Sequence, residues 1–153
     1  MALTRCISRP SDAWSCNVTD VSAFDDLYGL QIIEHSPDRM RGQLAVSDKV
    51  KQPYGLLHGG VLASIGETLA SVGTAIAVMD DGNIAVGMSN HTQFLRPITE
   101  GTVHAEARPV HRGRSTWVWD VQLSNDSGAL CAIGRVTIAV RPGPHPGMSP
   151  TQG

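Results

Sequence analysis

The sequence has few cysteines and no run of basic residues, and each absence excludes a class of protein. Its three cysteines, Cys6, Cys16 and Cys131, have no C-x-x-C spacing, so they indicate neither a disulfide framework nor a zinc site. The six histidines are scattered, with no His-x-His or H-E-x-x-H pattern, so we expect no catalytic metal. The formal net charge is −2, and without a Lys/Arg cluster we expect neither nucleic acid nor membrane as a partner.

The first ten residues, MALTRCISRP, contain no apolar segment of the kind found in a signal peptide, so we expect a cytoplasmic protein. A length of 153 residues suits one domain with a hydrophobic core. Residues 1–20 show little periodicity and are expected to form a flexible arm. Residues 143–153 are rich in proline and glycine and are expected to form a disordered tail. The domain itself is expected over residues 21–142.

Between these ends the apolar pattern changes from strand to helix and back to strand. A short helix or turn is predicted at 22–30, and two strands at 30–36 and 39–48 around a Pro-Asp turn. After a loop, residues 61–79 predict one helix of about five turns. Four further strands are predicted at 84–97, 102–110, 115–126 and 129–140.

The last three strands alternate between apolar and polar residues, so each has one face suited to a core. The apolar faces comprise Val103, Ala105 and Ala107, then Trp117, Trp119, Val121 and Leu123, then Leu130, Ala132, Val136, Ile138 and Val140. One helix cannot cover both faces of a six-stranded sheet. We therefore expect an α+β fold in which an antiparallel sheet curls around the helix. A long edge strand in such a unit also favours a dimer.

The stretch HGGVLASIGETLAS, residues 58–71, contains one carboxylate, Glu67, among small and apolar residues. The apolar segment is nearly long enough to span a membrane, but its small residues and central acid favour a helix buried inside a folded protein. A buried carboxylate is neutralised, hydrogen-bonded or used in chemistry. Glu67 is therefore either a catalytic group or a core acid paired with an arginine from elsewhere.

This order of elements, with HGG opening the helix and an acid inside it, resembles the hotdog-fold acyl-CoA thioesterases. Within them it is most similar to 4-hydroxybenzoyl-CoA thioesterases whose catalytic glutamate lies on the central helix. The resemblance covers about residues 27–142. It rests on Gln52, GLLHGGVLASIGETLAS (55–71), AVGMSNHTQFLRP (85–97), EGTVHAEA (100–107), TWVWDVQL (116–123) and CAIGRVTIAVRP (131–142).

The resemblance implies a hotdog fold, with five to six antiparallel strands wrapped around one long central helix. It also implies hydrolysis of an aromatic acyl-CoA, either 4-hydroxybenzoyl-CoA or a related aryl-CoA. No cofactor is implied, since coenzyme A is part of the substrate.

The resemblance also assigns catalytic roles to residues in and before the helix. Glu67 would be the nucleophile or general base, and the Gly59 N–H would polarise the thioester carbonyl. Ser71 would hold the attacking water or the carboxylate; the family often has threonine there, and a serine bonded back to a helix carbonyl is the alternative. Gln52 would assist at the carbonyl. His58 belongs to the same site and is expected to orient the loop more than to act in catalysis.

Contacts with the CoA arm are expected from the helix start and from basic residues. Gly60 and Gly59 would offer free N–H groups at the positive end of the helix, although two glycines also simply permit a tight turn. Arg96 matches a phosphate-contact position of the family. The turn at 111–116 supplies further candidates, with a solvated turn as the alternative: Arg112, Arg114, Ser115 and Thr116. Candidates for lining the acyl or pantetheine channel are Asn90, His91 and Thr92.

The spacing within the helix indicates a shared active site. Glu67 follows Gly59 by eight residues, which is about 10–12 Å along the helix axis. One thioester carbon cannot contact both groups of the same helix, so Glu67 would come from one subunit and Gly59 from its partner. A two-fold dimer would then hold two equivalent sites. The family builds its sites in this way, and the resemblance further implies a tetramer that is a dimer of dimers.

Other functions stay open at this point. The acyl group is alternatively of the phenylacetyl, dihydroxynaphthoyl or medium-chain type. An acyl-thioester dehydratase would pair His58 with Glu67, but the loop lacks the His-Phe-Pro pattern of that class. A non-catalytic acyl-CoA-binding module would keep Arg96 and the glycines without needing Glu67. For a hydrolase, attack by the carboxylate and activation of water both remain possible.

Overall fold

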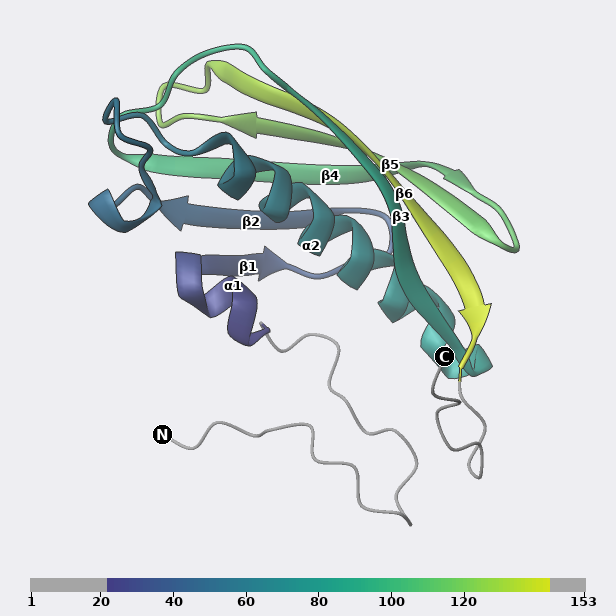
Figure 1. The fold of residues 1–153 in the computed structure, drawn as a ribbon. Helices are drawn as coiled ribbons and strands as arrows, with labels where there is room; N and C mark the ends of the chain where they lie inside the picture. Colours follow the sequence, from purple (N-terminus) through teal and green to yellow (C-terminus); the bar gives the residue numbers. More distant parts are fainter. Residues whose placement is uncertain (1–21, 144–153) are drawn as a thin grey trace.

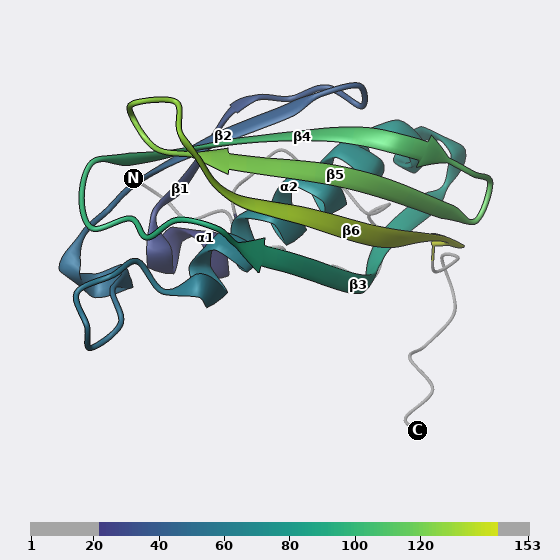
Figure 2. The ribbon, with the colours of Figure 1, turned by 90° about the horizontal axis from the view of Figure 1, so that it is seen from above.

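An antiparallel sheet of six strands curls around one long helix in residues 22–143, the part of the chain that this computed structural model describes (Figures 1 and 2). The strand order is β1-β2-β4-β5-β6-β3. The elements in chain order are α1 (Ala23–Tyr28), β1 (Leu30–Glu34), β2 (Met40–Ala45), η1 (Asp48–Val50), α2 (Gly59–Val78), η2 (Met79–Asp81), β3 (Asn83–Phe94), β4 (Thr102–Arg112), β5 (Thr116–Ser124) and β6 (Leu130–Pro142).

This arrangement confirms the hotdog fold expected from the sequence. The helix begins two residues earlier than predicted, at Gly59, and β3 ends at Phe94 instead of continuing to Pro97. The expected arm at 1–20, and the expected tail apart from Gly143, lie outside the described residues.

Helix α2 packs closely against the sheet at Trp119 of β5. The indole of Trp119 is fully buried and donates a hydrogen bond from Nε1 to Thr74 Oγ1 at 2.9 Å. A Cβ on Gly73 would lie 2.5 Å from the same ring, so only glycine allows the helix to approach this closely. By length and composition α2 could also cross a membrane. Its buried residues, among them Leu62, Ile65 and Leu69, pack in the hydrophobic core instead.

Strand β6 departs from the predicted alternation at its first residue. Leu130 was expected on the core face, but it is 38% exposed. The pairing with β5 shifts here, with Leu123 opposite Ala132 and Ser124 opposite Leu130, so Cys131 is an extra residue in β6. Such a bulge reverses which face the following side chain occupies. Leu130 therefore points outward, while Cys131 and Ala132 are fully buried.

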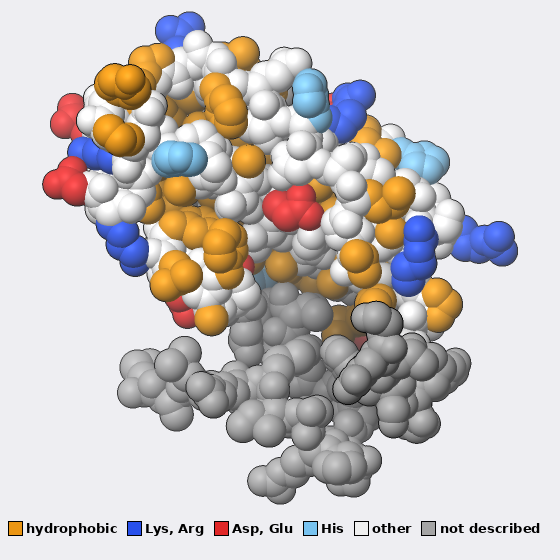
Figure 3. Space-filling model, viewed as in Figure 1, with side chains coloured by type: hydrophobic (Ala, Val, Ile, Leu, Met, Phe, Trp, Pro, Cys, Tyr) orange, Lys and Arg blue, Asp and Glu red, His pale blue; other side chains and the backbone are white. Residues whose placement is uncertain are grey.

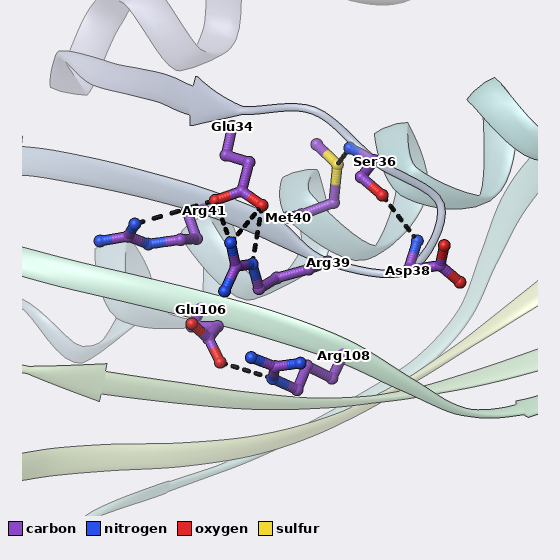
Figure 4. A network of polar contacts seen from close by, with 8 residues as sticks. All are labelled: Glu34, Ser36, Asp38, Arg39, Met40, Arg41, Glu106 and Arg108. Carbon is purple, nitrogen blue, oxygen red and sulfur yellow. Dashed lines mark hydrogen bonds and ion pairs between the residues drawn. The ribbon is translucent and has the colours of Figure 1, made fainter.

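The outer face of the sheet carries ion pairs (Figure 4). Glu34 bonds Arg39 at 2.7 Å, and Arg108 bonds Glu106 at 2.6 Å. The hydrogen bond from Arg39 holds the pKa of Glu34 below its usual range. On β5 and β6 the same face carries Asp120 bonded to Arg135 at 2.8 Å. The charged side chains thus follow the convex surface, and the concave surface is left to the helix.

The short helix α1 is fastened to α2 by a buried carboxylate. Asp25 is 3% exposed and accepts hydrogen bonds from Ser22 Oγ (2.5 Å), Thr68 Oγ1 (2.7 Å) and the Tyr28 hydroxyl. Burial, together with the hydrogen bond to Asp25, raises the pKa of Tyr28 far above its usual value, so the hydroxyl stays a donor. Because Thr68 directly follows Glu67, this cluster fixes α1 beside the central acid.

Replacing Asp25 by alanine is expected to lower the free energy of unfolding by about 1–3 kcal/mol, because the buried Tyr28 hydroxyl and the half-buried Thr68 hydroxyl lose their acceptor. Urea unfolding followed by circular dichroism would measure the loss. Asp26→Ala is the matched control, since Asp26 lies in the same helical turn but is exposed. Equal losses of unfolding free energy in the two variants would show that the hydrogen bonds to Asp25 do not stabilise the fold.

Candidate active site

Glu67 lies in the middle of α2 with its side chain half-buried against β3. Its Oε2 accepts a hydrogen bond from Asn90 Nδ2 at 3.2 Å, and the same Nδ2 donates to the carbonyl of Ala63 at 3.0 Å. A Cβ on Gly87 would overlap Glu67 Oε1, so the absence of a side chain there makes room for the carboxylate. Within residues 22–143 no lysine or arginine pairs with Glu67, so the alternative of a core acid paired with an arginine finds no support there.

On the face of the molecule that carries α2, charged side chains lie mainly toward the rim, and several apolar patches lie between them (Figure 3). Strand β3 borders this face as an edge strand of the sheet. The edge of β3 that faces away from β6 has no strand partner in the described part of the chain. Several apolar side chains of β3 are exposed, including Val86 (46%), Met88 (58%) and Phe94 (57%).

The helix start offers one free N–H group. His58 is the N-cap, and its Nδ1 accepts the Gly60 N–H at 2.9 Å. The sequence predicts a free N–H at Gly60, whereas the structure shows it bonded. The Gly59 N–H has no acceptor among the described residues. The ring of Phe94 lies over Gly59, where a Cβ would be 2.9 Å from it. His58 thus caps the helix through its side chain, and its expected role in orienting the loop stays a prediction.

The loop before α2 folds back on itself, so that Gln52 lies near the start of the helix. Lys51 and Leu57 form an isolated bridge, and the Gln52 N–H donates to the Leu56 carbonyl at 2.8 Å. The Gln52 side chain is half-buried, and no side-chain hydrogen bond from it to another residue is seen within residues 22–143. Ser71, one turn after Glu67, is also half-buried, and no hydrogen bond to a helix carbonyl is seen for it, unlike Thr74, which bonds the Ala70 carbonyl.

The expected CoA contacts fall at opposite ends of the sheet. Arg96 follows β3 on an exposed segment near the helix start. The turn that carries Arg112, Arg114, Ser115 and Thr116 lies at the far end of β4, about 35 Å along an 11-residue strand. There Arg112 bonds the carbonyl of Pro37 at 2.9 Å, bonds Asp38 and covers the Trp117 ring. One protomer therefore does not bring Arg96 and this turn together.

The side chain of His91 lies on the opposite face of the sheet from those of Asn90 and Thr92. Asn90 and Thr92 face the helix side, where Thr92 Oγ1 donates to Asn90 Oδ1 at 2.8 Å. His91 instead lines a shallow outer pocket with Gln93, Asp120 and Arg135. Of the three residues expected to line a channel, Asn90 thus contacts Glu67, Thr92 contacts Asn90, and His91 lies on the other face.

A cavity of about 390 Å³ adjoins the helix start on the side of α1. Phe24, Leu27 and Val61 supply apolar walls, and His58 and Lys49 line it as well. No cluster of three potential metal ligands occurs in residues 22–143.

Two contacts of this region have no signal in the sequence. The bond from Asn90 to Glu67 joins residues 23 positions apart, and the bond from Thr68 to Asp25 joins residues 43 apart. Asp25 in particular reads as an ordinary acid in the first turn of a helix, and only its burial marks it as part of the site's surroundings.

A family model, similar proteins and solved structures all indicate the same family. The family model described as the thioesterase superfamily matches residues 54–132. The 1,4-dihydroxy-2-naphthoyl-CoA hydrolase of Listeria monocytogenes is 36% identical over 113 residues, which cover 74% of this chain and 91% of that protein. The proofreading thioesterase EntH of Cronobacter turicensis is 29% identical over 124 residues, covering 81% and 90%.

Among solved structures, a variant of thioesterase PA1618 from Pseudomonas aeruginosa superposes with a TM-score of 0.75 at 34% identity, covering 78% of this chain and 86% of that one. The family match spans more than half of the chain and centres on the segment that holds Gly59, Glu67 and β3. Fold and relatives agree, and the chain belongs to the thioesterase superfamily as an acyl-CoA thioesterase of the hotdog fold.

Proposed function

We propose that this enzyme is a cytoplasmic homo-oligomer that hydrolyses an aromatic acyl-CoA to the free acid and CoA. Glu67 of one subunit acts at the thioester carbon, and the Gly59 N–H of the partner polarises the carbonyl. The observation that carries this proposal is the pairing of a free N–H with an acid about 12 Å further along one rigid helix. The two groups are too far apart to serve one carbon within one protomer.

The open edge of β3 supports a shared site. It is 12 residues long, it lies beside both Glu67 and Gly59, and its apolar side chains are exposed. An unpaired edge of this kind is a template for pairing with a second strand. Antiparallel pairing of β3 with its copy about a two-fold axis would bring the helix start of each subunit toward the Glu67 of the other. A tetramer formed from two such dimers belongs to the same proposal.

The chemistry depends on the two oxygens of Glu67. Oε2 is engaged by Asn90, while Oε1 accepts no hydrogen bond within the described chain. Oε1 either takes a proton from water, whose oxygen then attacks the thioester carbon, or attacks that carbon itself to form a mixed anhydride that water cleaves. In both routes the carbonyl oxygen becomes negative beside the Gly59 N–H, and the CoA sulfur leaves with the bonding electrons and is protonated.

An aryl substrate is supported by the cavity beside the helix start. Its volume and its walls of Phe24, Leu27 and Val61 suit an aromatic ring next to a carbonyl held by Gly59. The relative from Listeria monocytogenes is named for a bicyclic aryl-CoA, which favours this class over medium-chain acyl groups. The 4-hydroxybenzoyl and dihydroxynaphthoyl esters are both candidates, and phenylacetyl-CoA is the nearest alternative.

Contacts to the CoA phosphates are assigned to cations from different subunits. Arg96 lies at the end of the sheet that holds Gly59. Since the turn with Arg114, Ser115 and Thr116 lies at the opposite end, it would reach the nucleotide only from a neighbouring subunit. Arg112 is already bonded to Asp38, so it would have to exchange that partner.

A panel of CoA thioesters tests the proposal. We expect kcat/KM for 4-hydroxybenzoyl-CoA or 1,4-dihydroxy-2-naphthoyl-CoA to exceed that for octanoyl-CoA by at least about tenfold, because a rigid ring fills the cavity without losing chain entropy. Phenylacetyl-CoA tests whether a methylene between ring and carbonyl is tolerated. A higher value for octanoyl-CoA than for every aryl ester would overturn the aryl assignment.

Two rival functions make different predictions. A dehydratase would need His58 and Glu67 at one carbon, but His58 is engaged as the helix cap and stands nine residues before Glu67. A binding module would retain CoA esters without releasing thiol. Release of free CoA, measured with a thiol reagent, separates hydrolysis from both.

A further inference from the structure

We propose that Thr92 and Asn90 form a hydrogen-bonded chain that positions the Glu67 carboxylate, so that both act through Glu67 and neither acts as a ligand of the substrate. This inference rests on the proposed catalytic role of Glu67. It reassigns two residues that the sequence suggested as lining of the substrate channel.

Hydrogen bonds at both ends fix the orientation of the Asn90 amide. Thr92 Oγ1 donates to Asn90 Oδ1 at 2.8 Å, which fixes the carbonyl end of the amide toward Thr92. The amide nitrogen then faces α2 with two protons. One goes to the Ala63 carbonyl at 3.0 Å and the other to Glu67 Oε2 at 3.2 Å. The two acceptors on α2 already favour this orientation, and the Thr92 hydroxyl adds the contact that holds the opposite end of the amide in place.

A bulge in β3 determines which of its side chains face Glu67. Side chains alternate along a strand, so residues 87 and 90 would normally lie on opposite faces. In β3, however, Gly87 pairs with Ile138 and Ser89 pairs with Thr137, which leaves Met88 as an extra residue. The bulge brings Gly87 and Asn90 to the same face. Gly87 thereby makes room for Glu67 Oε1, while Asn90 holds Oε2.

Charged side chains of the neighbouring elements lie away from the Glu67 carboxylate. Among the described residues, the groups of β3 that face it are uncharged. The charged side chains of β2, β4, β5 and β6 belong to the outer face or to the strand ends. Asp25 of α1 is engaged by Tyr28 and by Thr68 of α2, and His58 caps the helix start. The Asn90 amide is therefore the donor that sets the direction of Glu67, and the Thr92 hydroxyl sets the direction of the amide.

Thr92→Val, which keeps the shape and removes the hydroxyl, tests the chain of contacts. We expect kcat to fall about tenfold with KM within twofold of the parent, since the acid is misdirected and the substrate contacts remain. Asn90→Ala should lower kcat by about 100-fold in the same way. Thr92→Ser should restore most of the rate. Thr137→Val is the matched control, a threonine of the neighbouring strand on the outer face.

If Thr92→Val and Asn90→Ala raise KM at unchanged kcat, the two residues line the substrate channel and the inference is wrong. It is equally wrong if Thr92→Ser is as slow as Thr92→Val.

A second measurement requires no turnover and so separates this inference from the proposed function. The chain contains four asparagines, so selective ¹⁵N labelling gives four side-chain amides. The Asn90 signals should shift in Glu67→Gln and in Thr92→Val, and should stay in place in Thr92→Ser and Thr137→Val. Shifts of this kind in a protein that hydrolyses no thioester would support the contacts and refute the function. Unmoved Asn90 signals in folded Glu67→Gln and Thr92→Val would refute the contacts.

Discussion

Replacing Glu67 by glutamine is expected to lower kcat for an aryl-CoA by about 10³-fold, because the amide can neither attack the thioester carbon nor take a proton from water. The substitution preserves shape, and Asn90 can still donate to the amide oxygen, so binding of the CoA ester should remain. Stopped-flow release of CoA gives kcat, and calorimetric titration with a non-hydrolysable thioether analogue gives the affinity.

Glu100→Gln is the control, because Glu100 is an exposed carboxylate in the loop between β3 and β4. Parental turnover by Glu67→Gln would remove Glu67 from the mechanism. In the parent enzyme, a single turnover in H₂¹⁸O tests the anhydride route: label in Glu67 reports an anhydride that water cleaves at the Glu67 carboxyl carbon. Label in the product alone reports attack of water at the acyl carbon, either of the thioester or of the anhydride, and rapid-quench trapping of an acyl-enzyme then distinguishes the two.

Replacing Gly59 by proline is expected to lower kcat by about 10²–10³-fold, because proline has no N–H to donate to the developing oxyanion. Proline is well tolerated as the first residue of a helix, and His58 already has the extended backbone (φ −68°, ψ 129°) that a residue before proline prefers. Gly59→Ala is the matched control. It brings a Cβ against the exposed Phe94 ring, as proline does, but it keeps the N–H.

Mixing the two inactive variants tests whether subunits share the site. In a dimer of one Glu67→Gln chain and one Gly59→Pro chain, one site combines both defects and the other has neither. An equal mixture that exchanges subunits freely should regain about a quarter of parental activity, since half of its dimers are mixed and each of these has one sound site of two. A mixture that stays inactive after verified subunit exchange would place both groups in one protomer's own site.

The fold could be predicted from the sequence because it depends on periodicity. Alternation at 103–107 and 117–123 indicates the core faces of β4 and β5, and the apolar stretch around Glu67 indicates the central helix. The separation of Gly59 from Glu67 is likewise a property of any helix. Features that depend on local pattern alone are therefore accessible without the structure.

The bulges are not accessible in this way. An extra residue at Met88 or Cys131 reverses which side chains face the helix, yet neither residue type signals a bulge. This is why strict alternation puts Leu130 on the wrong face and does not set Asn90 beside Gly87. The contact between Asp25 and Thr68 is hidden for another reason, since it depends on how α1 packs and not on any spacing along the chain.

Helix α2 has no acidic residue in its first turn and no basic residue in its last, and two acids, Asp80 and Asp81, come after its C-terminal end. Suitable charges at these ends would each stabilise the fold by about 0.3–1 kcal/mol. An aspartate near Gly59 would, however, repel the negative oxygen that forms there during hydrolysis. The helix thus gives up stability that a purely structural helix would retain, and its N-terminal end is where a stabilising substitution should cost the most turnover.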